Sequence, residues 1–325
     1  MLVRFIIKRI LILLPVIFGI TIVLFIINLI MPGDPVLVMM PEGVRPEMFD
    51  QVYHSIYLRL GLDRPVWEQY FRWLYNFVFM GDWGLSSMAN RPVVDVLGEP
   101  LRNTILLNVV VNIVYIGIAL PVGIKMAVKR GSLFDNGWQV FSLATFAMPS
   151  FFLGLCLIFI FGVTLGWLPI GGMPNPVFYQ GFSLLVQWVR HLALPATTLV
   201  IISLASAIRY VRNAMIDALS MDYIRTARSK GLNEKIVIYS HAFRNALIPI
   251  STIVVLTLFA LIGGSVITET IFSYNGIGRF LFRAVVGRDR MVIISTQLLF
   301  AIVNVFAVLV ADVVYGLVDP RVKLK

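Results

Sequence analysis

Residues that could carry out chemistry are sparse in this 325-residue chain. It contains no G-x-x-x-x-G-K-[ST] loop, so it is not expected to bind and hydrolyse ATP by that route. It also lacks H-E-x-x-H and G-x-S-x-G, the common motifs of zinc and serine hydrolases. His54, His191 and His241 fall in three separate segments, and no metal site is expected from them. We therefore predict no catalytic, cofactor-binding or metal-ligating residue.

Polar side chains inside apolar stretches are the remaining candidates. Asn108 and Asn112 are four residues apart, which places them on one face of a helix. Gln297 and Asn304 share a face of a later helix, and Asp312 follows further along it. Such residues could line a polar passage or bind an ion. We favour interhelical hydrogen bonding, worth about 0.6 kcal/mol per contact, and a structural role for Asp312.

The composition assigns the chain to the membrane proteins. Hydrophobic residues make up 59% and charged residues 14%, whereas globular proteins have about 45–50% and about 25%. The mean hydropathy of +0.88 excludes a soluble enzyme, a DNA-binding protein or a disordered chain. The single cysteine, Cys156, lies in an apolar run and is interpreted as a small core residue.

Stretches of about 20 apolar residues, long enough to cross a bilayer as helices, occur six times. The fold class predicted is therefore an all-α polytopic membrane protein with six transmembrane helices. An N-terminal anchor helix lies within residues 1–31, and an extracytoplasmic segment of short helices occupies residues 32–103. That segment either meets an external partner or only seals the outer mouth. The remaining spans are predicted near 104–124, 140–162, 191–208, 246–268 and 291–316, within a domain over residues 104–318.

The basic residues predict the orientation. With both termini inside, all seven lysines fall on the cytoplasmic side, as the positive-inside rule requires. The net charge of +10 then needs no nucleic acid to explain it. Four arginines depart from the rule, because they fall in the last outer loop: Arg279, Arg283, Arg288 and Arg290.

The inner segment, residues 209–244, is predicted to present a short helix over residues 220–231. Ser220 is expected to cap it, Asp222 to stabilise its first turn, and Gly231 to end it in a left-handed conformation. Asn233 should cap a second helix. Apolar residues at helical spacing make the first helix amphipathic (Ile216, Leu219, Tyr223 and Ala227), with Arg225, Thr226, Arg228 and Lys230 exposed. Without further information, it is either an interfacial helix on anionic lipid or a rigid element presented to a partner.

The chain resembles the permease subunits of ABC-type peptide importers, the dipeptide/oligopeptide (peptide/nickel) family of binding-protein-dependent inner membrane components. The resemblance runs along the whole chain. The motifs that carry it are Pro32–Pro35, Gly61–Pro65, Gly81–Gly84, Asp222–Gly231, His241–Pro249, Glu269–Phe272, Gly276–Gly278 and Asp319–Arg321.

The resemblance implies a type I ABC importer transmembrane domain in a prokaryotic inner membrane. With a sister permease, the chain would form a pore for di- or oligopeptides. Two separate ATPase subunits would bind ATP and Mg, and an extracytoplasmic binding protein would deliver the substrate. Oligosaccharide, nickel or glutathione import is the alternative, and a secondary carrier is a more distant one. The residues implied to form the ATPase-coupling helix are Ser220, Asp222, Tyr223, Arg225, Thr226, Ala227, Arg228, Lys230 and Gly231.

Overall fold

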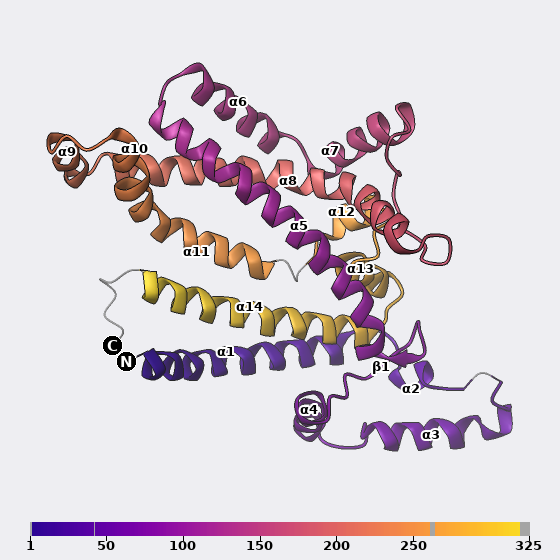
Figure 1. Cartoon of the computed structure of the whole chain (residues 1–325). Helices are drawn as coiled ribbons and strands as arrows, with labels where there is room; N and C mark the ends of the chain where they lie inside the picture. Colours follow the sequence, from indigo (N-terminus) through magenta and orange to yellow (C-terminus); the bar gives the residue numbers. More distant parts are fainter. Residues whose placement is uncertain (1, 42, 261–263, 319–325) are drawn as a thin grey trace. The chain divides into compact units, whose positions relative to one another are not determined.

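The structure is a computed structural model that describes residues 2–41, 43–260 and 264–318. These residues are mainly helical, with one antiparallel pair of short strands, β1 (Leu85–Ser86) and β2 (Arg91–Pro92). They form two compact units (Figure 1). Unit 1 comprises the described parts of Met1–Lys8, Leu101–Arg279 and Phe306–Lys325; unit 2 comprises Arg9–Pro100 and Phe280–Val305.

Unit 1 is built around the long helix α8, which packs against α6, α7 and α11. A close approach of α5 to α8 is possible at Gly123, because a Cβ there would lie 2.7 Å from the Val211 side chain. Around this contact, Leu107, Met126 and Ile208 form part of a buried apolar core. The helices that contribute to this unit are α5 (Val93–Val128), α6 (Leu133–Ala147), α7 (Ser150–Leu157), η3 (Ile158–Thr164), α8 (Gly181–Leu219), α9 (Asp222–Ser229), α10 (Glu234–Ile236), η4 (Val237–Phe243), α11 (Arg244–Ala260), α12 (Val266–Ile271), α13 (Ile277–Val286) and α14 (Arg290–Val318).

Unit 2 holds most of α1 and the short helices that follow it. Tyr70 is the centre of its aromatic packing, because its ring contacts Phe18 and Phe25 edge-on. The rings of Phe77 and Trp83 stack with their centroids 4.8 Å apart. The elements are α1 (Leu2–Ile30), α2 (Pro35–Val38), η1 (Pro46–Met48), α3 (Phe49–Leu60), α4 (Val66–Tyr75), η2 (Asn76–Met80), β1 and β2, with parts of α5, α13 and α14.

The predicted spans are found in part. Within the described residues, four unbroken helices are long and apolar enough to cross a membrane: Ile6–Ile30, Val93–Val128, Gly181–Leu219 and Arg290–Val313. The span predicted over 191–208 is shorter than the helix that contains it. It lies inside α8, which has 39 residues. Arg190, Arg209 and Arg212 lie within that helix, so limiting the span to the stretch between charges shortened it.

The span predicted near 140–162 is not one straight helix, because α6 meets the α7–η3 helix at an angle of 102°. The break falls at Met148 and Pro149. Proline has no N–H to continue a helix, and the residue before it avoids helical dihedrals; Met148 is extended, with φ −95° and ψ 120°. With this bent pair counted as one span, the described residues contain up to five candidates.

The other predicted segments differ from the structure in where their helices begin and end. Of the predicted span 246–268, α11 covers residues up to Ala260, α12 begins at Val266, and 261–263 lie outside the described residues. The expected short helices of the segment 32–103 are present, but α5 already begins at Val93. The motif Asp319–Arg321, together with Lys323 and Lys325, lies outside the described residues. The cytoplasmic placement of the termini therefore stays a prediction.

Arg290, one of the arginines that depart from the positive-inside rule, has a structural role in unit 2. Its guanidinium donates to the backbone carbonyl of Asn28 at 2.9 Å, to that of Gly33 at 3.2 Å, and to that of Met31. These carbonyls lie at the C-terminal end of α1, where unpaired acceptors and the helix dipole favour a cation. Arg290 therefore fixes the end of α1.

Replacement of Arg290 by alanine should lower the free energy of unfolding by about 1.5–3 kcal/mol, because it removes hydrogen bonds from a charged donor. The melting temperature of the purified protein in detergent measures this. Arg283→Ala, at an exposed side chain of α13, serves as the control. Equal melting temperatures for the two variants would show that Arg290 does not hold α1.

Candidate coupling and translocation site

The predicted cytoplasmic helix exists as α9, held between the end of α8 and the helical segment α10–η4. Two side chains of α9, Ile224 and Ala227, are buried. They belong to one apolar cluster with Met215 of α8 and Val237 of η4. Because its inner face is packed against two other elements, α9 is a rigid element that presents only its outer face.

The local prediction for α9 was right at its end and wrong at its start. Ser220 does not cap α9: it is the C-cap of α8, and its hydroxyl donates to the Asp217 carbonyl at 2.8 Å. Met221 occupies the N-cap position without a side-chain hydrogen bond. The helix break at Ser220 and Met221 leaves Ile216 and Leu219 in α8. Within α9, Ile224 is buried and Tyr223 is exposed, so the predicted apolar face was wrong at Tyr223. A serine near a helix boundary can serve either helix, and only the tertiary packing decides which.

Gly231 ends α9 as predicted. Its φ is +73°, a left-handed conformation. Its N–H donates to the Arg228 carbonyl at 2.9 Å, and the Leu232 N–H donates to the Ala227 carbonyl at 3.4 Å, the two bonds of a Schellman motif. The predicted cap at Asn233 is also confirmed, because its side chain accepts from the Lys235 N–H at 2.9 Å.

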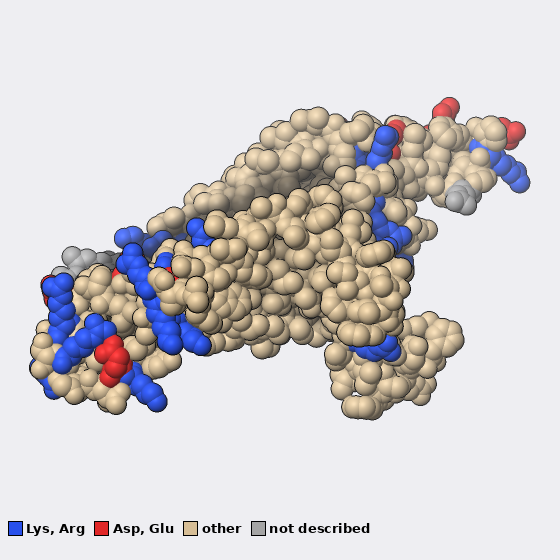
Figure 2. Space-filling view, turned by 90° about the horizontal axis from the view of Figure 1, so that it is seen from above, with Lys and Arg blue, Asp and Glu red and all other residues tan. Residues whose placement is uncertain are grey.

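The exposed face of α9 is basic, but its arginines differ in their partners. Arg228 forms an ion pair at 2.6 Å with Glu234 of α10, and this guanidinium lowers the pKa of the Glu234 carboxyl. Arg225 lies 3.8 Å from Asp222 in an almost fully exposed pair, which contributes little. Lys230 is exposed. Figure 2 shows several Lys and Arg side chains on the left of the view, the side on which α9 lies in Figure 1. Arg225 and Lys230 are therefore the better candidates to contact a partner.

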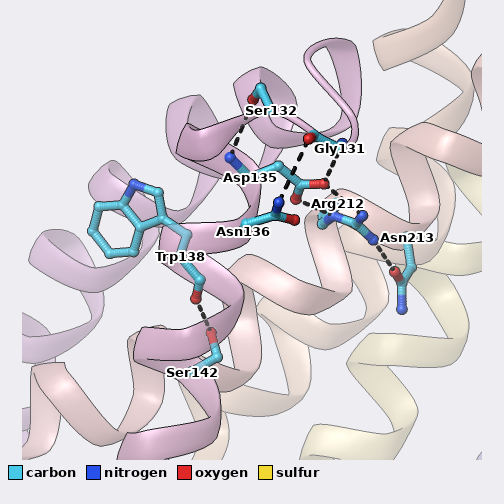
Figure 3. A network of polar contacts seen from close by, with 8 residues as sticks. All are labelled: Gly131, Ser132, Asp135, Asn136, Trp138, Ser142, Arg212 and Asn213. Carbon is cyan, nitrogen blue, oxygen red and sulfur yellow. Dashed lines mark hydrogen bonds and ion pairs between the residues drawn. The ribbon is translucent and has the colours of Figure 1, made fainter.

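An unpredicted ion pair connects α6 to α8 (Figure 3). The Asp135 carboxylate, with a side chain only 1% exposed, accepts from Arg212 Nε at 2.6 Å and from Arg212 Nη2 at 2.8 Å. The Gly131 N–H donates to the same carboxylate at 2.9 Å, and Ser132 caps the helix by accepting from the Asp135 N–H. In the sequence these two residues are only charged positions in segments predicted to lie on the same side of the membrane. Their pairing reflects the packing of α6 on α8.

The predicted polar face of α5 lines a hollow. Asn108 and Asn112, with Tyr115, face side chains of α8 and α11 across a cavity of about 310 Å³. Asn112 is buried; its amide N–H donates to the Asn108 carbonyl at 2.9 Å, whereas its Oδ1 has no hydrogen-bond partner in the described part of the chain. None of the lining side chains is charged: Asn108, Val111, Asn112, Tyr115, Leu199, Ser203, Ser206, Ala207, Tyr210 and Thr257. Such a surface suits neutral groups that form hydrogen bonds.

The polar candidates of α14 do not form a site of their own. Gln297 and Asn304 are exposed, and the Asn304 amide donates to the Phe300 carbonyl of the same helix at 2.9 Å. Asp312 is partly buried and takes part in an interaction within the protein. The Asn304 bond lies within α14, so it does not test the interhelical hydrogen bonds predicted for this helix, and the structural role of Asp312 stays a prediction.

A buried carboxylate that sequence reasoning missed explains one recognised motif. Glu269 of α12 is fully buried; it accepts from the Thr104 hydroxyl of α5 at 2.8 Å and from the Arg279 N–H at 2.9 Å. A Cβ at Gly276 would lie 2.4 Å from the Glu269 carboxyl carbon and 2.5 Å from the Thr104 hydroxyl. The glutamate and the glycine therefore require each other, and together they tie α5 to the start of α13. In the sequence, only the spacing of Glu269 and Gly276–Gly278 indicated this buried contact.

The fold and the charge distribution thus define a membrane protein of several long helices, with a rigid basic helix at one end of unit 1. Residues 119–324 match the family described as "Binding-protein-dependent transport system inner membrane component", and residues 1–113 match the N-terminal family of the same systems. The chain belongs to this family. It is an inner membrane component of a bacterial transport system, a transport component rather than a catalyst.

Three relatives are similar over nearly their whole length. The chain is 39% identical to the di/tripeptide transport system permease protein DppB of Pseudomonas aeruginosa, covering 98% of both chains. It is 36% identical to the dipeptide transport system permease protein DppB of Escherichia coli K12, covering 99% of both. It is 38% identical to the oligopeptide transport system permease protein AppB of Bacillus subtilis, covering 98% of this chain and 99% of the relative.

The Asp135–Arg212 pair should contribute strongly to stability. Asp135→Ala or Arg212→Ala alone should lower the free energy of unfolding by about 3–5 kcal/mol, because each leaves a largely buried charge without its partner. The double variant should lose no more than the worse single variant. Thermal unfolding of the four proteins measures this, with the exposed Asp217→Ala as a control. Additive losses in the double variant would show that the two side chains act independently.

Proposed function

We propose that this chain is the permease subunit of an ATP-driven importer of di- and oligopeptides, and that it forms the translocation pore with a sister permease. The observation that carries the proposal is full-length similarity to three permeases named for dipeptide, di/tripeptide and oligopeptide transport. The rigid basic helix α9 supports it, because a pore subunit without its own ATP site needs a fixed surface on which an ATPase can act.

The proposal includes partners that the chain itself does not contain. Two ATPase subunits bind ATP and Mg and supply the energy, and an extracytoplasmic binding protein delivers the peptide. The family description, which names binding-protein-dependent systems, supports this assembly. In the proposed topology six spans cross the membrane and both termini are cytoplasmic. The α6–α7 pair then forms the third span and α11 the fifth.

The coupling route runs through buried contacts. An ATPase subunit docks on the outer face of α9, with Arg225 and Lys230 as charged contacts. Ile224 and Ala227 transmit its movement to α8 and η4, because they share one packed apolar cluster with those elements. The Asp135–Arg212 pair links α8 to α6. A displacement of α9 therefore moves several helices of unit 1 together.

The hollow beside Asn112 is proposed as part of the passage. Its uncharged mixture of amide, hydroxyl and apolar groups suits peptide bonds, which are neutral and carry one donor and one acceptor each. A surface of this kind would not discriminate strongly among side chains, as expected for a carrier of varied peptides.

Reconstitution of the complete transporter tests the substrate class. Both permeases, both ATPases and the binding protein are placed in proteoliposomes, and ATP hydrolysis is measured with a dipeptide, a longer peptide, an oligosaccharide, Ni²⁺ or glutathione. Peptides should stimulate hydrolysis and enter the vesicles. Stimulation by a non-peptide ligand alone would contradict the proposed substrate.

Gly231 provides a test of coupling that separates backbone conformation from steric space. A Cβ at Gly231 would meet nothing within 4 Å, so only its φ of +73° opposes substitution. Gly231→Val should strain the end of α9 by about 1–2 kcal/mol, because branched residues disfavour the left-handed region. Peptide-stimulated ATP hydrolysis and uptake should fall.

Gly231→Asn is the matched control, because asparagine tolerates a left-handed conformation and should keep most of both activities. Co-purification of the ATPase subunits reports whether docking itself is retained. If the valine variant transports peptide as well as the native protein does, α9 does not couple the ATPase to the pore.

A further inference from the structure

One helix of unit 2 exposes a row of aromatic side chains. Four residues of α4 and η2 recur at intervals of four and share one face. We name Trp67, Phe71, Tyr75 and Phe79 the aromatic stripe; their exposed fractions are 66%, 55%, 51% and 74%. The backbone stays helical from α4 into η2, so the stripe is continuous. An exposed apolar surface of this kind marks an interaction site.

The opposite face of α4 packs against the membrane-spanning helix α1. Tyr70, only 7% exposed, places its ring against Phe18 and Phe25, with centroids 6.0 and 5.3 Å away. Its hydroxyl forms a hydrogen bond of 2.7 Å with the Thr21 hydroxyl. Trp73 adds a second ring contact with Phe25. The position of α4 along α1 is therefore well defined.

These contacts place α4 beside the apolar part of α1 and not beyond its end. The apolar helix runs over Ile6–Ile30. At about 1.5 Å per residue, Phe25, Thr21 and Phe18 lie about 8, 14 and 18 Å before Ile30. The hydrocarbon layer is about 30 Å thick and each leaflet about 15 Å, so Phe25 and Thr21 fall within the leaflet next to the C-terminal end of α1 and Phe18 lies near the midplane.

The charged groups of α4 are directed away from the stripe or paired at its start. Arg72 extends towards the end of α3, where its Nη1 would lie 3.1 Å from a Cβ at Gly61. Glu68 in the first turn forms an ion pair with Arg64. Beside the contact with α4, the exposed residues of α1 are also apolar: Ile22, Val23, Ile26, Ile27 and Ile30. The outer face of α4 and the neighbouring part of α1 therefore both present apolar side chains.

We propose that α4 is an interfacial helix embedded in the leaflet at the C-terminal end of α1, with lipid covering the aromatic stripe. The rings of Phe71 and Phe79 contact acyl chains, while the polar atoms of Trp67 and Tyr75 reach the headgroup level. In the proposed topology this is the outer leaflet. The segment after α1 is then anchored in the bilayer twice, by α1 and by α4. The inference does not depend on what the protein transports.

Nitroxide labels at single cysteines test this in proteoliposomes of the assembled complex. Phe71→Cys and Phe79→Cys are made in a Cys156→Ala background, with Val23→Cys on α1 as the lipid reference and Asp63→Cys as the water reference. Collision with oxygen, which is soluble in lipid, is compared with collision with a water-soluble nickel chelate. Positions 71 and 79 should resemble position 23, where oxygen dominates, and position 63 should show the reverse order.

Two results would overturn the proposal. Nickel collision at 71 and 79 equal to that at 63 would place the stripe in water. Exclusion of both reagents would mean that a protein, such as the sister permease or the binding protein, covers it.

A second measurement leaves the phenylalanines intact. The fluorescence of the native protein minus that of Trp67→Phe reports on Trp67 alone, and lipids brominated in the upper acyl chain should quench it. Absence of quenching would likewise contradict lipid contact.

Discussion

The absence of water from the bilayer core is the constraint on which this structure depends. The backbone groups of a membrane-spanning segment must find their partners within the protein, since hydrocarbon offers none, and a buried polar side chain without a partner is costly there. The backbone groups of the long helices form hydrogen bonds within each helix. Charged side chains near the helix ends form contacts that hold one helix to another. Asp135 accepts two hydrogen bonds from Arg212, Glu269 is enclosed by Thr104 and backbone N–H groups, and Arg290 caps α1. These contacts set how the helices of each unit pack.

Tight contacts within the protein also matter for the proposed function. In the proposed importer separate ATPase subunits supply the energy, so this chain must transmit movement, and movement is transmitted well where packing is tight. The α9 helix meets this requirement, because its buried residues join it to α8 and η4 while its basic face stays exposed. The hollow lined by Asn108 and Asn112 lacks charges and suits neutral peptide bonds. An importer of varied peptides needs both properties: a helix that transmits movement rigidly, and a passage whose lining accepts different side chains.

Local backbone requirements were predictable where neighbouring residues alone determine them. Gly231 as a left-handed helix end and Asn233 as a cap follow from residue type and position, and both are found. Helix boundaries judged from charges were less accurate. Residues such as Arg190 and Arg212 lie within α8, because arginine can remain in a helix while its guanidinium reaches a partner or the surface. Ser220 shows the same limit, since its residue type suits either of the two helices that it separates.

The sequence by itself determined the class of protein, the basic character of the segment 209–244, most of the helical regions and the family motifs. Hydropathy, charge and turn chemistry are properties of nearby residues. The tertiary structure decided the partners. Asp135 and Arg212 are 77 residues apart, and Thr104 and Glu269 are 165 apart. It also decided that α6 and α7 meet at 102° and that α4 lies against α1 through Tyr70 and Thr21. Such pairings depend on how helices pack, and no local pattern encodes the distance between side chains on different helices.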